Sequence, residues 1–226
     1  MLFIRKVEIN MKSILVIGMG RFGRSLATKM YELGNDVMIV DEDSELINEL
    51  SPNFTDACVG DCRKELVLKS LGINNFDVCF VTIGENFQSS LEITSLLKEL
   101  GAKRVVSKAN RDIQEKFLLR NGADEVINPE KDMAEKLAIR YNANKIFDFI
   151  ELTPDFSIFE IPIFEHWIGK SIAELNIRNK YEINILAIKK GQNINTLPGP
   201  TYVFEGDDHI VIAGKIDVVT KLTSKM

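Results

Sequence analysis

The first half of the chain alternates short apolar runs with longer amphipathic segments. The runs occupy residues 13–17, 37–40, 57–59, 78–81, 104–108 and 125–127. Short runs of this kind, rich in β-branched residues, are typical of buried parallel strands. In the segments between them apolar residues recur at the helical period, as Phe22, Leu26, Met30 and Leu33 do. Strands that alternate with helices predict a parallel sheet with right-handed crossovers. We expect a doubly wound α/β domain over residues 13–147.

The pattern changes in the second half. A helical stripe over residues 131–141 is followed by the unusually apolar stretch 146–150 and a turn signal at Thr153-Pro154-Asp155. Short alternating strands then follow at residues 156–161, 183–188 and 210–213. We place a domain boundary at 147/148 and predict a small α+β domain over residues 148–226. Residues 1–12 precede the first strand and are treated as an N-terminal extension.

Composition limits the possible partners. The chain has 226 residues, 45% of them hydrophobic, and a formal net charge of −5. An acidic surface repels phosphate backbones, so we expect no nucleic acid partner. No run approaches the roughly 20 apolar residues that span a bilayer, so any role at a membrane would require a partner. The three cysteines form no C-x-x-C pair and no disulfide framework.

A glycine-rich loop, residues 18–23, joins the first strand to the first helix. It reads Gly18-Met19-Gly20-Arg21-Phe22-Gly23, and Asp41 ends the next strand. In this pattern the first glycine permits a tight turn, the second lets backbone approach a phosphate, and the third allows close helix packing. The helix N-terminus attracts the phosphate, and the acidic residue accepts hydrogen bonds from a ribose. The sequence therefore predicts a Rossmann-like nucleotide site; the alternative is a turn that only packs.

Arg21 adds a fixed charge within this loop. A pyrophosphate between two nucleosides is largely satisfied by backbone donors, so an additional guanidinium favours a ligand with terminal phosphate charge, such as ATP or ADP. The alternative is that Arg21 points into solvent, which is common for arginine at a helix start.

Several motifs together resemble RCK domains, the regulators of potassium conductance. They are the glycine loop, Asp41, Gly60-Asp61, Ile83-Gly84-Glu85-Asn86, Gly122-Ala123-Asp124 and Pro129-Glu130-Lys131. The chain looks most like the cytosolic gating subunit of Ktr/Trk-type bacterial potassium uptake systems, from about Lys12 to its end. The resemblance implies an N-terminal Rossmann-like RCK domain followed by a C-terminal RCK subdomain.

The resemblance also implies which residues bind the nucleotide. The loop with Arg21 would hold phosphates, Asp41 the ribose, and Asp61 would lie beside the adenine. Lys108 would face the phosphates, and Glu130 would reach a neighbouring subunit's nucleotide directly or through a divalent cation. The candidate set is Gly18, Met19, Gly20, Arg21, Phe22, Gly23, Asp41, Glu42, Asp61, Cys62, Ile83, Gly84, Asn86, Lys108 and Glu130. For Asp61 and Glu130 the alternatives are a loop carboxylate and a helix N-terminal carboxylate.

The second domain resembles a subdomain that holds cyclic di-AMP at a dimer interface. Four residues fall in the matching segments: Arg178, Asn179, Ile185 and Pro198. Ordinary turns and core packing explain each of them equally well. His166 and His209 have no cysteine or histidine partners at metal spacing, so no metal site made of protein ligands alone is predicted.

We expect a regulatory binding protein and not an enzyme. The segment after the first domain offers no acid/base set for a dehydrogenase. The resemblance implies a homodimer assembled into an octameric ring that binds ATP or ADP and gates a membrane potassium channel or transporter from the cytoplasmic face. The alternatives are an NAD(H)-binding redox sensor of the same fold and a small NAD-dependent reductase.

Overall fold

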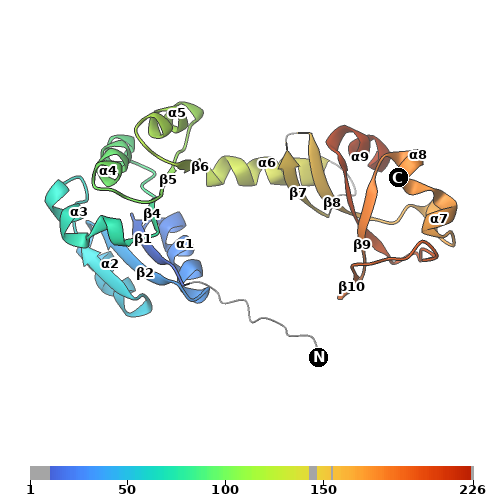
Figure 1. The fold of residues 1–226 in the computed structure, drawn as a ribbon, viewed down its shortest axis with the longest axis horizontal. Coiled ribbons are helices and arrows are strands. Elements are labelled where there is room, and N and C mark those ends of the chain that lie inside the picture. Colours follow the sequence, from blue (N-terminus) through green and yellow to red (C-terminus); the bar gives the residue numbers. More distant parts are fainter. Residues whose placement is uncertain (1–10, 143–146, 154, 225–226) are drawn as a thin grey trace. The chain divides into compact units, whose positions relative to one another are not determined.

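The computed structural model describes residues 11–142, 147–153 and 155–224. The chain divides into two compact units, Met1–Lys131 and Asp132–Met226, drawn in blue to green and in yellow to red in Figure 1. By this division most of the last helix of the first half, α6 (Pro129–Asn142), belongs to the second unit. The domain boundary at 147/148 stays a prediction.

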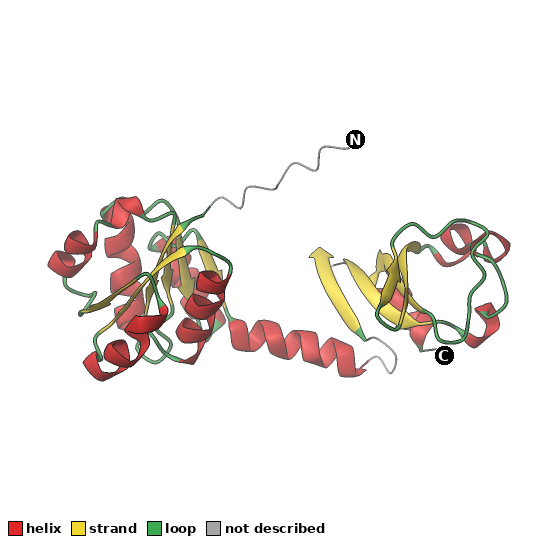
Figure 2. Cartoon of the chain, turned by 90° about the horizontal axis from the view of Figure 1, so that it is seen from below, coloured by secondary structure: helices red, strands yellow, loops and turns green. Residues whose placement is uncertain are grey.

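The first unit is a parallel sheet with helices on both faces (Figure 2). Its strands are β1 (Ser13–Ile17), β2 (Asp36–Asp41), β3 (Asp56–Val59), β4 (Val78–Val81), β5 (Val105–Lys108) and β6 (Glu125–Ile127). They lie in the order β3-β2-β1-β4-β5-β6, and every pairing is parallel. This is the strand order of a dinucleotide-binding Rossmann fold. In this fold β2 and β3 lie on one side of β1 and the later strands on the other, so the strand order reverses between β1 and β4. The predicted fold of this half is confirmed.

Side chains of the central strand alternate between two apolar layers. Leu15 and Ile17 of β1 pack in one layer and Ile14 and Val16 in the other, all of them buried. Because both faces of β1 are covered, the strand is apolar from Ile14 to Ile17. The connecting helices are α1 (Arg21–Glu32), α2 (Ser44–Leu50), α3 (Glu65–Leu71), α4 (Phe87–Glu99) and α5 (Asp112–Arg120).

Two helices beside the nucleotide-fold crevice begin with a side-chain cap. Asp43 accepts hydrogen bonds from the backbone N–H groups of Glu45 and Leu46 at the start of α2. Asn86 accepts one from Ser89 N at the start of α4. These caps satisfy donors that a helix leaves open at its first turn.

Beyond α6, the described part of the second unit is an antiparallel sheet with three short helices. The strands are β7 (Asp148–Thr153), β8 (Phe156–Pro162), β9 (Asn184–Lys190), β10 (Asn193–Asn195) and β11 (His209–Lys215), in the order β10-β9-β11-β8-β7. The helices are α7 (Ile172–Leu175), α8 (Ile177–Tyr181) and α9 (Ile216–Thr223). Trp167, Phe159 and Phe204 fill the core between sheet and helices. The prediction of a small α+β domain is confirmed.

Two strands of this sheet were not predicted. β10 is polar along its length, with all three residues exposed, so its sequence carries no alternating pattern. β7 begins within the apolar stretch 146–150 seen in the sequence and continues to Thr153. Ile146 lies outside the described residues. β7 pairs only with β8 among the described strands, and Ile150 is 61% exposed.

Candidate functional site

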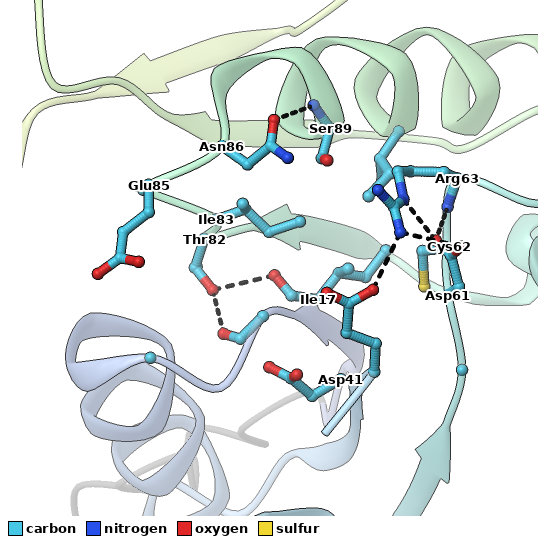
Figure 3. Close-up of a pocket in the computed structure, with 16 residues that line it drawn as sticks. Ile17, Asp41, Asp61, Cys62, Arg63, Thr82, Ile83, Glu85, Asn86 and Ser89 are labelled. Carbon is cyan, nitrogen blue, oxygen red and sulfur yellow. Dashed lines mark hydrogen bonds and ion pairs between the residues drawn. The ribbon is translucent and has the colours of Figure 1, made fainter. Parts of the chain in front are cut away.

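A crevice opens between the carboxyl ends of β1 and β4, where the strand order reverses. It encloses about 750 Å³ of space, open solvent at its mouth included. Figure 3 shows its wall. The lining residues are Ile17, Gly18, Gly20, Asp41, Glu42, Gly60, Asp61, Cys62, Arg63, Thr82, Ile83, Gly84, Glu85, Asn86, Ser89 and Ile93. Open α/β sheets bind ligands at this position.

The glycine loop has the shape that its sequence demands. Gly18 adopts φ +98°, a left-handed conformation that side chains disfavour. A Cβ on Gly23 would lie 2.0 Å from Gly18 O and 2.6 Å from Thr82 Oγ1, so only glycine lets α1 pack this close to the sheet. Thr82 at the end of β4 fixes the loop, because its Oγ1 lies 2.6 Å from Gly18 O and 3.0 Å from Ile17 O. The loop is thus built before any ligand arrives.

Gly20 is the one glycine of this loop that the protein itself does not require. A Cβ on Gly20 would meet no atom within 4 Å, and φ is −62°, which any residue adopts. Gly20 lines the crevice at the N-cap of α1, where no side chain caps the helix and no acidic residue occupies the first turn. Open backbone N–H groups and the helix dipole face the space that a Cβ would fill. This arrangement fits a phosphate group.

Asp41 at the end of β2 holds the loop as well as facing the crevice. Its Oδ2 accepts a 2.6 Å hydrogen bond from Met19 N, and its Oδ1 accepts a 3.0 Å bond from Asp43 N. A carboxylate has about four lone-pair sites, so two hydrogen bonds leave room for ribose hydroxyl groups. Asp41 therefore combines a structural contact with the predicted ligand contact.

Arg63, which the sequence analysis did not single out, bonds two acidic residues that follow β2 and β3. Arg63 Nε lies 2.8 Å from Asp61 Oδ1, and Arg63 Nη2 lies 3.1 Å from both Asp61 Oδ2 and Glu42 Oε2. The hydrogen bond from Arg63 lowers the pKa of Asp61, since it favours the charged carboxylate. Next to them, burial raises the pKa of the Cys62 thiol to about 12, so Cys62 contributes a small neutral wall.

The β4 side of the crevice is held by amide groups. Asn110 Nδ2 donates a 2.6 Å hydrogen bond to Gly84 O, which fixes the turn after β4. A Cβ on Gly84 would lie 3.4 Å from Lys108 Nζ, so the lysine head group reaches this turn. Asn86 uses its oxygen to cap α4 and lines the crevice, leaving its amide N–H₂ as a donor on that wall (Figure 3).

A charged cluster lies beside the start of α1. Lys108 Nζ at the end of β5 bonds Glu130 Oε1 at 2.7 Å and lies 5.9 Å from the centroid of the Phe22 ring. The hydrogen bond from Lys108 lowers the pKa of Glu130, and the charge of Arg21 contributes in the same direction. Arg21 and Lys108 thus place two cations beside the start of α1, together with the carboxylate of Glu130. Glu130, predicted to reach a neighbouring subunit, here contacts Lys108 of its own chain.

The structure brings most of the predicted set together. Gly18, Gly20, Asp41, Glu42, Asp61, Cys62, Ile83, Gly84 and Asn86 line one crevice. Arg21, Lys108 and Glu130 form the neighbouring cluster, while Phe22 lies below Lys108 and Gly23 packs under the loop. Met19 differs, because its side chain is fully buried in the core and only its backbone contacts Asp41.

Sequence reasoning missed Thr82, Arg63 and Ser89, all of which line the crevice. Thr82 directly follows the β4 run, and Arg63 follows the Gly60-Asp61-Cys62 segment, so position at a strand end was an available signal. Ser89 lies in the first turn of α4 and only the fold shows that it faces the crevice.

Two of the four candidates for a second ligand bond neighbouring side chains of the second unit. Arg178 Nε donates to Asn184 Oδ1 at 2.7 Å, and Asn179 Nδ2 donates to Asn176 Oδ1 at the same distance. Asn179 lines a surface pocket with Lys170 and Glu174, and none of the other three candidates lines it. Binding of cyclic di-AMP stays a prediction.

The described residues contain no group of three or more His, Cys, Asp or Glu side chains placed to hold a metal ion. Within the same residues, none of the helices has both the length and the apolar character needed to cross a bilayer.

Comparison with known proteins gives the same division of the chain. Residues 14–129 match the TrkA-N domain family, and residues 156–226 match the TrkA-C domain family. The chain is 38% identical over 215 residues to the Ktr system potassium uptake protein C of Bacillus subtilis, covering 95% of this chain and 97% of that protein. It is also 38% identical to the Ktr system potassium uptake protein A of the same organism, covering 92% and 93%.

Solved structures share the fold at lower identity. The GsuK channel matches with a TM-score of 0.69 and 17% identity, covering 95% of this chain, which spans 39% of that channel's chain. The GsuK channel bound to NAD matches with a TM-score of 0.64 and 16% identity, covering 96% of this chain and 40% of the channel's. These likenesses establish the two-part architecture.

Proposed function

Because this chain belongs to the family of TrkA-N and TrkA-C domain proteins that includes the Ktr potassium uptake proteins, we propose that it is a regulatory subunit that binds an adenine nucleotide and gates a membrane potassium channel or transporter. The similarity covers almost the full length of its Ktr relatives, so both RCK parts of those proteins are represented here.

The open position at Gly20 is the observation that carries nucleotide binding. Nothing in the protein needs a glycine there, whereas a phosphate approaching the uncapped start of α1 does. The crevice then offers Asp41 for a ribose, and beyond it the loop at Asp61 for a base. A nucleotide can thus lie from the α1 N-terminus toward the end of β3.

The two cations beside the start of α1 favour ATP or ADP over NAD(H). Arg21 and Lys108 place two positive charges near the α1 N-terminus, where Glu130 bonds Lys108 and Asp41 bonds Met19 N. Terminal phosphate oxygens would use such cations, whereas the neutral nicotinamide ribose of NAD would not. A divalent cation held jointly by Glu130 and the phosphates is part of this proposal.

NAD(H) is the second candidate. The GsuK channel, which shares this fold, has been solved bound to NAD. A Kef C-terminal domain with 21% identity and a TM-score of 0.51, covering 58% of this chain and 80% of that one, has been solved in an AMP-bound form. A small NAD-dependent reductase is the third. We favour binding over catalysis, because the relatives of this chain are potassium uptake proteins and the crevice offers carboxylates and an amide for holding a ligand.

Gating follows from linkage between ligand and shape. A nucleotide that binds one arrangement of the subunits more tightly shifts the population toward it. We propose that the chain forms a homodimer within an octameric ring at the cytoplasmic face of a membrane, and that the ring transmits this shift to the potassium pore.

Calorimetry on the Arg21→Ala variant tests whether the chain binds ATP or NAD(H). If Arg21 meets a terminal phosphate, the variant loses a charge-assisted hydrogen bond worth about 1.5–3 kcal/mol, or roughly tenfold to hundredfold in ATP affinity. NAD affinity should change much less. Asp41→Ala is a poorer probe, because it also removes the acceptor for Met19 N. Equal losses for ATP and NAD, measured at one salt concentration, would instead favour the NAD(H) sensor.

Gating is tested by potassium uptake. The wild-type chain and Arg21→Ala would each replace the regulatory subunit of a cell that retains a Ktr-type pore protein. The wild type should restore uptake and Arg21→Ala should alter its dependence on cellular ATP. Failure of the wild type to form a complex with any such pore protein would refute the assignment.

A further inference from the structure

Arg63 occupies an unusual position for a surface arginine. It follows β3, yet its guanidinium reaches both Asp61 at the end of β3 and Glu42 at the end of β2. The charge of Glu92, on α4 across the crevice, also acts on it. The side chain therefore projects over the crevice from the β3 edge, as Figure 3 shows.

The hydrogen bonds fix the guanidinium plane. Arg63 Nε and Nη2 pair with the two oxygens of Asp61, and a side-by-side pair of this kind holds donors and acceptors in one plane. Arg63 N also donates to Asp61 Oδ1 at 3.1 Å, which anchors the carboxylate to the loop. In-plane bonding leaves the faces of the guanidinium available for stacking.

Part of the crevice wall is apolar. Ile17, Ile83 and Ile93 line the crevice from β1, the turn after β4 and α4. Cys62 lines it as a neutral thiol. An apolar wall and a flat cation in the same pocket fit a planar aromatic ring, since arginine attracts the face of a π-system and apolar carbon shields the other face.

We propose that Arg63 is a specificity-determining residue that stacks on the nucleotide base, with Asp61 and Glu42 as the residues that position it. The inference rests on the proposed nucleotide function and deepens it. Different residues contact the two ends of the nucleotide: the cations at the start of α1 contact the phosphates, and Arg63 stacks on the base. A surface ion pair alone would not require two acidic partners from different strand ends and a place in the crevice wall.

The test compares Arg63→Ala, Arg63→Lys and a control. Arg104→Ala is the matched control, because Arg104 also pairs with a carboxylate, Glu125 Oε2 at 2.6 Å, but does not line the crevice. ATP, ADP and AMP affinities are measured for each by calorimetry, with AMP by competition. Circular dichroism confirms that each variant keeps the wild-type unfolding midpoint.

Loss of the stacking contact should weaken all three nucleotides by the same factor, about threefold to thirtyfold, because the base is common to them. Arg63→Lys keeps the charge but loses the flat surface, so it should recover only part of the affinity. Arg104→Ala should bind as the wild type does. The ratio of ATP to CTP affinity should fall in Arg63→Ala, since the larger purine ring offers more stacking area.

Three results would overturn the inference: unchanged affinities in Arg63→Ala, a loss that grows with the number of phosphates, or full recovery in Arg63→Lys. The second and third would assign Arg63 a purely electrostatic role. If the wild-type chain itself bound none of the nucleotides, the proposed function would fail instead, so the two failures are distinguishable.

Discussion

Replacing Gly20 by alanine should separate nucleotide binding from folding. The added Cβ would meet no protein atom within 4 Å, and φ at −62° is open to alanine. Alanine is a poorer N-cap than glycine, at a cost of up to about 1 kcal/mol. It also restricts the unfolded chain, which stabilises by about 0.4–1 kcal/mol. The two terms offset, so the unfolding free energy should change by less than about 0.5 kcal/mol.

Binding should respond much more strongly. A phosphate that accepts hydrogen bonds from the first turn of α1 must approach the backbone at Gly20, into the space that the Cβ would take. Losing one hydrogen bond to a charged group costs about 1.5–3 kcal/mol, so ATP affinity should fall roughly tenfold to hundredfold. Calorimetry measures this loss. ATP affinity at the wild-type value in Gly20→Ala would refute the placement of the phosphate.

Two other glycines serve as controls. Gly199→Ala, where a Cβ also meets nothing within 4 Å, lies in the second unit and should change neither quantity. Gly23→Ala should destabilise by about 2 kcal/mol or more, because its Cβ would lie 2.0 Å from Gly18 O. Unfolding must be followed by circular dichroism, since the single tryptophan, Trp167, lies in the core of the second unit.

Three further measurements follow from the structure. Thr82→Val removes the buried hydroxyl that contacts Gly18 O and should lower the unfolding free energy by about 1–2 kcal/mol in urea; an unchanged midpoint would contradict it. The pKa of Asp61 should lie below 3.8 by NMR titration and rise in Arg63→Ala, so the stabilisation that this pair provides is present above the unfolded pKa and lost as the pH falls through the folded value. Light scattering should give a dimer or a multiple of it, weakened in Ile150→Glu, because the edge strand β7 exposes Ile150; a wild-type monomer at micromolar concentration would argue against this.

The sequence predicted the first unit well because each level of its pattern agrees. β1 is apolar from Ile14 to Ile17 since both of its faces are buried, and the glycine loop follows it directly. Position at a strand end was then enough to place Asp41 and Asp61 in the crevice. β10 could not be predicted, because a short exposed edge strand has no apolar periodicity.

Contacts between distant polar side chains were beyond the sequence. Glu130 and Lys108 are 22 positions apart, and nothing local indicates that they pair. Arg63 follows a recognisable loop, but only the fold shows that Glu42, 21 positions earlier, ends the neighbouring strand. Residues far apart in the sequence lie close together when their strands are neighbours in the sheet. The Arg63–Glu42 pair could therefore be expected only once β2 and β3 are known to be neighbours.

The Lys108–Glu130 pair also connects the crevice to the helix that leads out of the first unit. Glu130 belongs to the first turn of α6, which continues to Asn142, and Lys108 ends β5 beside the turn at Gly84. Lys108 is only 10% exposed, whereas Glu130 is 66% exposed, so the lysine is held by the fold and the carboxylate is free to exchange partners. A terminal phosphate near the start of α1 would compete with Glu130 for this lysine, and a divalent cation would bind Glu130 and the phosphate together. If the proposed nucleotide binds, the number of its phosphates would therefore change the contact that holds the first turn of α6.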